Sequence, residues 1–510
     1  MSTSTQNVDL DEIAKKLLIL LSYRKSGGCI DKINSDGLKS LFENIYPYFQ
    51  YPDTYVFYLP QQRPKLIDHS FPWKTAYNAA ILNQYIERDA NGNTKTITVN
   101  VDAIIGEAIQ NRIHKYSRIN DPKPYEFQMK TLATALAVLD PVRKYLRDGD
   151  VAGVKKIFVN NDSLTPAVIA ALASTGGGKT EIFETLALQL TLDSFTGASK
   201  KNDKSIADFT KAILIYPMKA FMIDHFRRFV EDVTYINNTF LNGKEFQINI
   251  GILYGDTPSE SELTNGDQIL SVVEYLLYNK NCPMCGGELE VKSYRNEYPY
   301  YSIKCKNNHR INIIISRDKL FKHPPDILLT TVDAFNYILL EPNRHKLLGK
   351  ETSLPPLLLA VDEPHIYTGV FGSNVSLIFR AFDYVVQQYT GSQTYKPLKI
   401  ATSATMPHAQ EFLAKLFVES INDIKIIESS PSSQELKSKT KGILTLLPDS
   451  SYGFQNATVE IIPLIAGLLP KEWRKILVFV DSREYAETLK KQIEDFITRG
   501  LPDFSECLHL

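Results

Sequence analysis

The sequence has no long apolar run, no excess of charge of either sign, and few cysteines and tryptophans. A membrane-spanning helix needs about 20 consecutive apolar residues, so neither such a helix nor a membrane partner is expected. The segment Met1–Lys16 has no apolar core, which excludes a signal peptide within it. Lys and Arg number 57 against 58 Asp and Glu, a net charge of −1. This balance excludes a globally basic nucleic-acid binder, so any nucleic-acid surface must be a local patch.

Cysteine occurs five times in 510 residues, too rarely for a disulfide scaffold. Three of the five, Cys282, Cys285 and Cys305, lie within 24 residues. That clustering indicates metal binding in a reducing compartment, and we therefore expect a cytoplasmic protein. Hydrophobic residues make up 44% of the chain and charged residues 23%, which is ordinary for globular proteins. The length predicts about two to four domains.

Short apolar, β-branched runs alternate with helical stretches from Pro124 onward. This alternation is typical of a parallel sheet with helices on both faces, and it predicts an α/β lobe. The runs predicted as strands are Ala167–Ala173, Ala212–Tyr216, Ile248–Tyr254, Ile327–Thr331, Leu357–Val361 and Lys399–Thr402.

The same pattern predicts how the chain divides. Residues 1–115 are expected to form an N-terminal accessory region, and residues 116–430 the α/β lobe with an insertion at 278–314. A Ser- and Lys-rich linker at 431–445 precedes residues 446–510, which begin another α/β unit. Further expected elements are helices at Asp9–Tyr23 and Asp36–Tyr46, a hairpin turn at Ala90–Thr94 before a strand at Lys95–Val101, a strand at Lys475–Val480 and a helix at Arg483–Ile497.

A phosphate-binding loop is predicted between the strand Ala167–Ala173 and the helical stretch Glu181–Leu190. The loop reads Ala173-Ser-Thr175-Gly176-Gly177-Gly178-Lys179-Thr180. Glycines let backbone N–H groups converge on a phosphate, and the N-terminus of the helix adds a dipole that favours the anion. Lys179 would neutralise phosphate charge and the Thr180 hydroxyl would bind Mg²⁺. The first glycine of the usual pattern is Ala173 here, and the alternative is a glycine-rich turn followed by an incidental Lys-Thr.

An acidic box, Asp362-Glu363-Pro364-His365, follows the apolar strand Leu357–Val361. A carboxylate at the carboxyl end of a parallel strand faces the phosphate loop in this architecture. Asp362 could hold Mg²⁺, and Glu363 could orient and deprotonate an attacking water. By itself such a tetrapeptide is more often a solvated loop, so its meaning depends on the phosphate loop.

These segments, taken together, resemble the ordered motifs of superfamily 2 DExH-box helicases. The phosphate loop resembles motif I and the acidic box motif II, while Ser403-Ala404-Thr405 resembles motif III and Tyr125–Gln128 the Q motif. The segments Tyr216–Ala220, Pro325–Thr331 and Val478–Ser482 resemble motifs Ia, Ib and IV. The run His365–Ser373 is similar to the branch of Mrf-type DNA-repair helicases and of the helicase of DISARM phage defence.

The resemblance implies a RecA-like P-loop lobe with ATP, Mg²⁺ and a nucleic acid as ligands. It implies that Gln128 reads the adenine edge, and that Thr175, Gly176, Gly177, Gly178, Lys179, Thr180 and Asp362 hold the nucleotide and its Mg²⁺. It further implies that His365 connects the nucleotide to motif III, that Ser403 and Thr405 couple hydrolysis to lobe movement, and that Pro217, Lys219, Thr330 and Thr331 lie along the strand. For the two threonines a cap or turn role is equally expected, because Thr-Thr often ends a buried strand.

A zinc site is predicted from Cys282-Pro-Met-Cys285 and Cys305-Lys-Asn-Asn-His309. The spacing C-x₂-C-x₁₉-C-x₃-H is that of a closed tetrahedral site with four protein ligands. A redox Cys-x-x-Cys pair and an unmetallated pair of turns are the alternatives. Nearby Lys, Arg and Tyr residues suggest that the module guides nucleic acid or a partner, and a solvated face is the alternative.

The function implied by the resemblance is that of an ATP-dependent helicase or translocase, with DNA favoured over RNA. The sequence has no Gln-x-x-Gly-Arg-x-x-Arg segment, the motif VI that carries an arginine finger, and it ends at Leu510. We therefore expect the N-terminal half of a helicase with a truncated second RecA-like lobe, completed by another polypeptide. The alternatives are an ATP- and nucleic-acid-binding half-protein with little turnover, acting as an adaptor or remnant, and a CRISPR-type helicase subunit.

Overall fold

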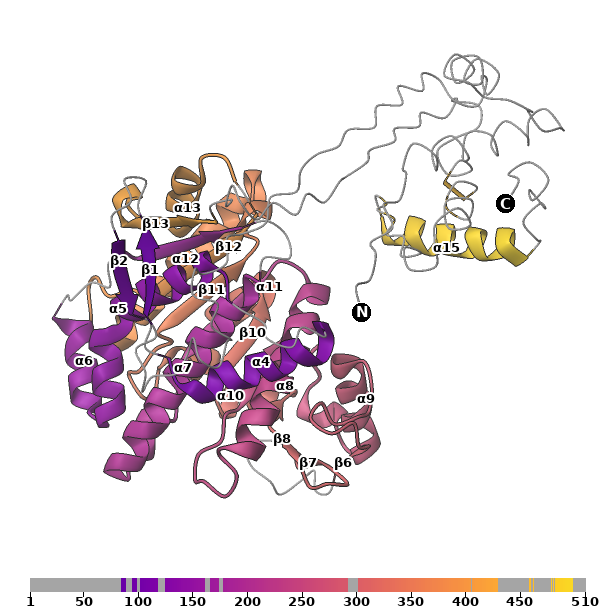
Figure 1. Cartoon of the computed structure of the whole chain (residues 1–510), viewed down its shortest axis with the longest axis horizontal. Coiled ribbons are helices and arrows are strands. Elements are labelled where there is room, and N and C mark those ends of the chain that lie inside the picture. The colour runs from indigo at the N-terminus through magenta and orange to yellow at the C-terminus, as the bar shows by residue number, and fades with distance from the viewer. Residues whose placement is uncertain are drawn as a thin grey trace, which may run out of the picture. The chain divides into compact units, whose positions relative to one another are not determined.

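The computed structural model divides the chain into two compact units, residues 62–435 and a second unit made of residues 1–61 with 436–510 (Figure 1). The structure describes residues 84–88, 94–98, 101–117, 124–160, 166–173, 178–291, 301–404, 406–429, 458–459, 462, 478, 480 and 482–498. The described part therefore consists almost entirely of the first unit, and each unit is considered by itself.

The first unit is built on an eight-stranded sheet in the order β13-β3-β12-β11-β4-β10-β5-β9, and every neighbouring pair is parallel. The strands are β3 (Val168–Leu172), β4 (Ala212–Tyr216), β5 (Ile250–Leu253), β9 (Ile313–Ile314), β10 (Ile327–Thr331), β11 (Leu358–Asp362), β12 (Leu398–Ser403) and β13 (Ile424–Glu428). Strands β3, β4, β5, β11 and β12 are buried along their whole length, because their side chains face helices on both sides.

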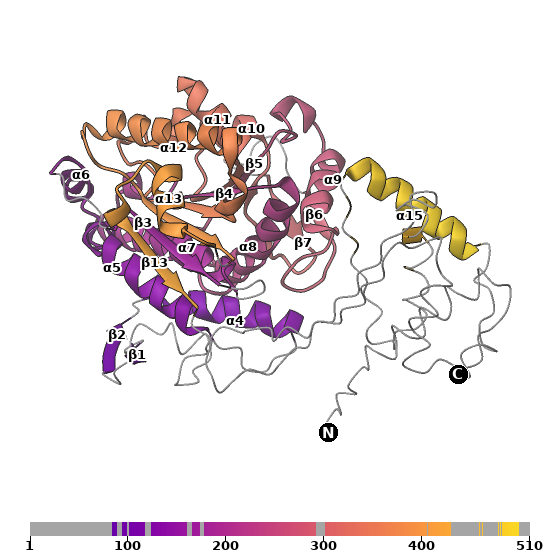
Figure 2. The same cartoon turned by 90° about the horizontal axis from the view of Figure 1, so that it is seen from above.

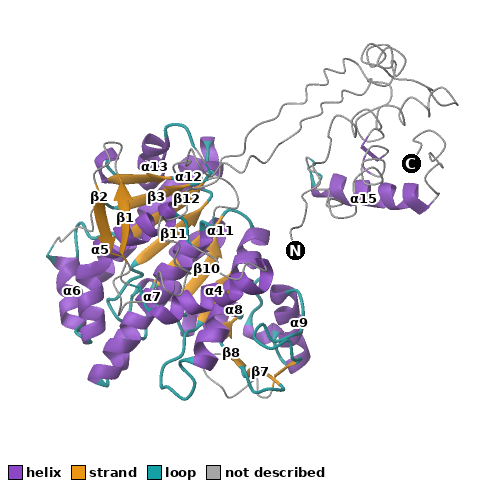
Figure 3. Ribbon diagram, viewed as in Figure 1, coloured by secondary structure: helices purple, strands orange, loops and turns teal. Residues whose placement is uncertain are grey.

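Helices cover both faces of this sheet, with α5 and α7 on one face and α11 and α12 on the other (Figures 2 and 3). The helices of this unit are α4 (Ala103–Ser117), α5 (Glu126–Asp148), α6 (Val151–Val159), α7 (Thr180–Lys201), α8 (Lys219–Thr239), α9 (Gly266–Leu277), α10 (Arg317–Lys322), α11 (Val332–Leu340), α12 (Gly369–Thr390) and α13 (Ala409–Phe417). Short 3₁₀ turns lie at Lys204–Ile206, Glu260–Glu262, Pro342–Leu348, Pro364–Ile366 and Ile421–Asp423. The predicted RecA-like lobe, a parallel sheet between two helical layers, is confirmed.

Two small sheets accompany the main one. Strands β6 (Leu289–Val291), β7 (Ile303–Cys305) and β8 (Arg310–Ile311) form an antiparallel sheet within the insertion. Strands β1 (Gln84–Arg88) and β2 (Thr94–Thr98) pair antiparallel, which confirms the hairpin predicted around Ala90–Thr94. None of the described helices is both long enough and apolar enough to cross a bilayer.

All six strands predicted for the lobe are present, and those at Ala212–Tyr216 and Ile327–Thr331 have the predicted bounds. Strands β9 and β13 were not predicted. Strand β13 reads Ile-Lys-Ile-Ile-Glu with two exposed charged side chains, so it lacks the continuous apolar signature of its neighbours. The helices predicted at Asp9–Tyr23 and Asp36–Tyr46 and the linker at 431–445 lie outside the described residues, as does most of the strand predicted at Lys475–Val480.

In the second unit the structure describes one long helix, α15 (Arg483–Thr498), within one residue of the helix predicted there.

Candidate nucleotide-binding site

The candidate site lies where three neighbouring parallel strands end. Strand β12 lies between β3 and β11, with Ser403 aligned with Leu172 and Asp362 with Thr402. Parallel strands bring their carboxyl ends to one edge, so the segments that follow β3, β11 and β12 meet there. Backbone bonds fix this meeting, because the Ala173 N–H donates to the Ser403 carbonyl at 3.0 Å.

The described end of the phosphate loop is held by Gln128 from the first turn of α5. The Gln128 Nε2 donates to the Gly178 carbonyl at 2.5 Å, and its Oε1 accepts from the Tyr125 N–H at 2.7 Å. Gly178 has φ +70°, and a Cβ there would lie 2.6 Å from Gln128 Nε2. The positive φ favours a glycine at this position, and a larger residue would displace the Gln128 side chain. Thr175, Gly176 and Gly177 lie outside the described residues.

Lys179, at the start of α7, is buried and contacts the acidic box. Its Nζ donates to the Ala173 carbonyl at 3.1 Å and lies 3.2 Å from Glu363 Oε1. Thr180 is the first residue of α7, at the positive end of the helix dipole. The phosphate-loop lysine and the carboxylate of the acidic box thus neutralise each other.

Asp362 ends β11 and is buried, with its Oδ1 accepting a hydrogen bond from the Thr402 hydroxyl at 2.6 Å. Burial raises the pKa of Asp362 to about 6, with the Glu363 carboxylate acting in the same direction. A nearby cation would stabilise the ionised form of this buried carboxylate. The residues present therefore fit a divalent metal ion next to the phosphate loop.

Glu363 has φ +46°, a conformation that costs a non-glycine residue about 1–3 kcal/mol and that clusters at functional sites. Its N–H donates to the Thr402 carbonyl at 2.7 Å, and its Oε2 lies 3.1 Å from His365 Nδ1. The same ring nitrogen is 2.8 Å from Ser403 Oγ, so the acidic box and the segment after β12 are joined through this histidine. Thr405 lies outside the described residues.

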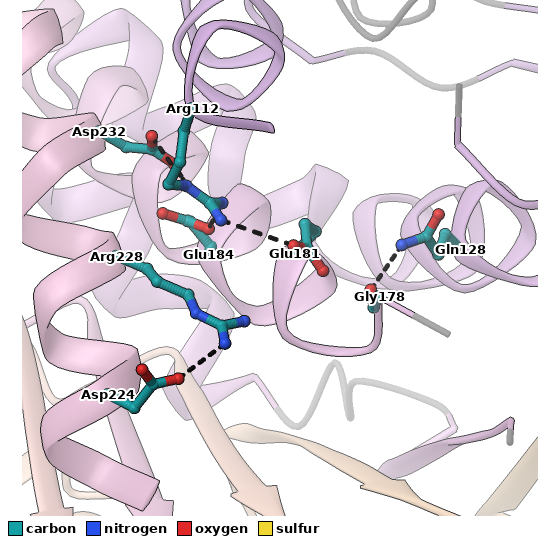
Figure 4. Close-up of polar contacts among 8 residues, drawn as sticks. All are labelled: Arg112, Gln128, Gly178, Glu181, Glu184, Asp224, Arg228 and Asp232. Carbon is teal, nitrogen blue, oxygen red and sulfur yellow. Dashed lines mark hydrogen bonds and ion pairs between the residues drawn. The ribbon is translucent and has the colours of Figure 1, made fainter. Parts of the chain in front are cut away.

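Sequence reasoning missed a buried charge cluster beside the phosphate loop. Arg112 of α4 points between α7 and α8 (Figure 4). Its guanidinium contacts Glu184 at 2.6 Å, Asp232 at 2.9 Å and Glu181 at 3.6 Å. Burial raises the pKa of Glu184 well above its usual range. No motif marks Arg112, because its partners lie 72 and 120 residues away along the chain.

The four residues expected along a nucleic-acid strand do not share one environment. Pro217 and Lys219 lie at the start of α8, where half-exposed Lys219 contacts Asp256 at 2.5 Å. Thr330 is fully buried and its hydroxyl donates to the Leu253 carbonyl of the adjacent strand at 2.9 Å. Thr331 is the N-cap of α11. The side chain of Thr330 is therefore not available at the surface, whereas Thr331 has the cap role that was one alternative.

Cys282, Cys285, Cys305 and His309 come together as the spacing predicts. Their ligand atoms all lie within 4.8 Å of one another, with Cys285 and Cys305 sulfurs 3.6 Å apart and Cys282 Sγ 3.8 Å from His309 Nδ1. Ligands about 2.0–2.3 Å from a tetrahedral zinc ion stand about 3.4–3.8 Å apart, so the donor set fits zinc.

The insertion at 278–314, called the zinc module from here on, forms hydrogen bonds with two helices of the lobe. The Lys115 ammonium of α4 donates to the Pro283 carbonyl at 2.8 Å, between the first two cysteines. The Asn238 side chain, at the end of α8, exchanges two hydrogen bonds with the Arg310 backbone, both at 2.9 Å. The module is therefore connected to both α4 and α8.

The chain is similar in sequence to a known helicase. No protein-family model matches the chain. An uncharacterised ATP-dependent helicase of Methanocaldococcus jannaschii is 28% identical over 228 residues, which are 42% of this chain and 30% of that protein. The predicted helicase resemblance is confirmed.

Solved helicase structures are similar at lower identity. The DUF1998 helicase MrfA bound to DNA and AMPPNP matches with a TM-score of 0.45 and 16% identity, over 93% of this chain and 44% of MrfA. The Mycobacterium smegmatis helicase Lhr bound to ssDNA and AMP-PNP matches with a TM-score of 0.44 and 14% identity, over 78% of this chain and 36% of Lhr. The chain thus spans less than half the length of these helicases.

Proposed function

We propose that this lobe binds and hydrolyses ATP in an ATP-driven nucleic-acid helicase or translocase, with DNA the favoured strand. The observation that carries the proposal is the convergence of Lys179, Asp362 and Glu363 at the carboxyl edge of the sheet, with the His365–Ser403 contact beside them. Support also comes from the archaeal relative, which is described as an ATP-dependent helicase.

Each residue has a role in this proposal. Lys179 and the backbone of the phosphate loop, Gly178 included, bind the β- and γ-phosphates, and Gln128 supports the loop while reading the adenine edge. The Thr180 hydroxyl and Asp362 would hold Mg²⁺, which would neutralise phosphate charge in the transition state. Glu363 orients the attacking water and accepts its proton.

The ion pair between Lys179 and Glu363 gives the site a resting arrangement. A phosphate competes with Glu363 for the Lys179 ammonium, so nucleotide binding frees the carboxylate to take up water. The general base thus becomes available only when its substrate is bound. Glu363→Gln, which weakens this competition, should bind ATP a few-fold more tightly while it stops turnover.

His365 and Ser403 form the proposed link to movement. The 2.8 Å contact joins the acidic box on β11 to the segment that follows β12. A shift of Glu363 on hydrolysis would therefore be passed through His365 to Ser403.

The decisive experiment measures ATP binding and steady-state hydrolysis, with and without single-stranded DNA, for three proteins. The unmodified chain should hydrolyse ATP faster when DNA is present. Lys179→Ala should bind ATP at least about 30-fold more weakly, because losing one partner of a buried charge contact costs about 2–5 kcal/mol. Glu363→Gln should bind ATP a few-fold more tightly and lose about 10²–10⁴-fold in turnover. Undiminished ATP affinity in Lys179→Ala would refute the site.

We also propose that Cys282, Cys285, Cys305 and His309 hold a structural zinc ion. All four positions of a tetrahedral ion are then filled by protein ligands, which leaves none for a reacting water. The module's role is mechanical, because its two attachments reach α4, which carries Arg112, and α8, which begins at Lys219.

A further inference from the structure

A second group of contacts on α8 and α9 has no part in the nucleotide site. Lys219, at the start of α8, places its ammonium 4.9 Å from the ring centre of Tyr254 and 5.1 Å from that of Tyr275. Two turns further along α8, the Arg227 guanidinium lies 4.7 Å from the ring centre of Tyr278. Tyr275 lies in the last turn of α9, and Tyr278 is the residue that caps this helix. Helices α8 and α9 therefore form one surface that combines aromatic rings with cations.

The rings on this surface are open to solvent. Tyr275 is 48% exposed and Tyr278 is 56% exposed, although each has a cation packed against it. Tyr278 also has φ +63° where α9 ends, a position that usually takes glycine or asparagine. A large aromatic residue kept exposed in a strained conformation is costly for the fold and indicates a binding role.

The surface continues into a hollow next to it. A cavity of about 340 Å³ lies between α4 and α8. It is lined by Arg112, Ile113, Tyr116, Arg227, Arg228 and one carboxylate, Glu231. Arg227 thus belongs to both the tyrosine surface and the cavity. One carboxylate, Asp224, contacts both arginines, at 3.0 and 2.7 Å, which leaves one positive charge unneutralised within this trio.

The start of this surface lies close to the nucleotide site. Lys219 is the third residue after β4, and β4 pairs in parallel with β11, which ends at Asp362. Both segments therefore leave the same edge of the sheet. From Lys219 the surface runs along α8 to Arg227 and then to Tyr116, whose neighbour Lys115 contacts the zinc module.

We infer that Tyr275, Tyr278 and Arg227 form a stacking surface for single-stranded nucleic acid, which leads from Lys219 toward the zinc module. Exposed aromatic rings next to cations bind unpaired bases without regard to sequence, because every base has a π-face and every linkage a negative charge. The inference rests on the proposed function and extends it to a helix, α9, that carries none of the motifs.

The test measures binding of a fluorescein-labelled, mixed-sequence single-stranded DNA by fluorescence anisotropy. Tyr275→Ala and Tyr278→Ala should each weaken binding about 5–150-fold, the equivalent of about 1–3 kcal/mol per stacked base. Tyr275→Phe and Tyr278→Phe should keep the affinity, because the ring and not the hydroxyl carries the contact. The matched control is Tyr384→Ala, which removes a ring that is 62% exposed on α12 and should leave binding unchanged.

Arg227→Gln tests the electrostatic part, because it should reduce the slope of log affinity against log salt by about one. The inference is overturned if the alanine variants bind DNA as the unmodified chain does, and the face would then fit a protein partner instead. It is also overturned if the phenylalanine variants lose as much affinity as the alanine variants. Failure of the unmodified chain to bind DNA would refute the nucleic-acid part of the proposed function itself. The nucleotide site is tested separately by ATP binding, which Lys179→Ala should lose and the tyrosine variants should keep.

Discussion

Replacing Arg112 by methionine should destabilise the lobe strongly. The guanidinium is 5% exposed and is surrounded by Glu181, Glu184 and Asp232, which are buried as well. Methionine would fill much of the space and leave these carboxylates without their cation. Removing one partner of a buried ion pair costs about 3–5 kcal/mol. Because burial already raises the pKa of Glu184, a proton can take up part of the lost charge, which favours the lower end of this range.

Thermal unfolding followed by circular dichroism measures this cost. A loss of about 3–5 kcal/mol corresponds to a drop in Tm of about 5–15 °C for a domain of this kind. Arg147→Met is the matched control, because Arg147 is a partly exposed arginine that contacts exposed Asp140 at 3.5 Å. A surface pair of this kind contributes about 0–1 kcal/mol, so the control should unfold within a few degrees of the unmodified protein.

A combined variant separates the lost charge balance from lost packing. If unpaired carboxylates cause the destabilisation, adding Glu184→Gln and Asp232→Asn to Arg112→Met should recover a large part of the Tm. If packing alone is responsible, the three changes together should be no better than Arg112→Met. A drop of less than about 2 °C for Arg112→Met would refute the reasoning at its first step.

Three further predictions concern separate parts of the lobe. Gly178→Ala should weaken ATP binding by about 1–2 kcal/mol in a titration, since an alanine at φ +70° costs about that much and the loop would shift to relieve it. Gly243→Ala, at φ +73° with open space around it, is the control that should bind ATP normally. Burial lowers the pKa of His225 to about 3 in the folded chain, whereas a histidine in the unfolded chain has the ordinary pKa of about 6.5. As the pH falls below about 6.5, the unfolded chain therefore takes up a proton at this residue and the folded chain does not. Stability should therefore fall as pH drops below about 6.5, by about 1.4 kcal/mol at one unit below, and His225→Phe should unfold with a shallower pH dependence; an equal dependence in both proteins would contradict this assignment. Elemental analysis should find one zinc ion per chain and none in Cys305→Ser, with Cys507→Ser as the control that keeps the metal.

The sequence predicted those parts of the site in which a motif directly follows a strand. Lys179 follows β3 and Asp362 ends β11, so a correct prediction of two buried strands was sufficient to bring the residues to one edge. The Arg112 cluster could not be predicted, because it joins three helices through contacts between residues far apart in the chain. The side chain of Thr330 alternates with its neighbours across the sheet, and only the packed structure shows that it points into the interior.

The resting ion pair between Lys179 and Glu363 was also beyond prediction. Each residue was recognised by what it does to a nucleotide, and a motif says nothing of how its members contact one another when the substrate is absent. Strand β9 could not be predicted, because a strand of two residues shows no periodicity in the sequence. Its position in the sheet depends on the path by which the chain returns from the insertion to the lobe.

That return path has a practical consequence for protein engineering. Strand β9, Ile313–Ile314, pairs with β5 and is the outermost strand of the main sheet in the described residues. An apolar parallel strand left open at a sheet edge is a template for aggregation. A version of the lobe trimmed of residues 278–314 to simplify it would lose this cover along with the zinc ligands. The insertion thus ends the sheet on a strand of two residues, which offers neighbouring molecules a shorter edge than the four residues of β5 would.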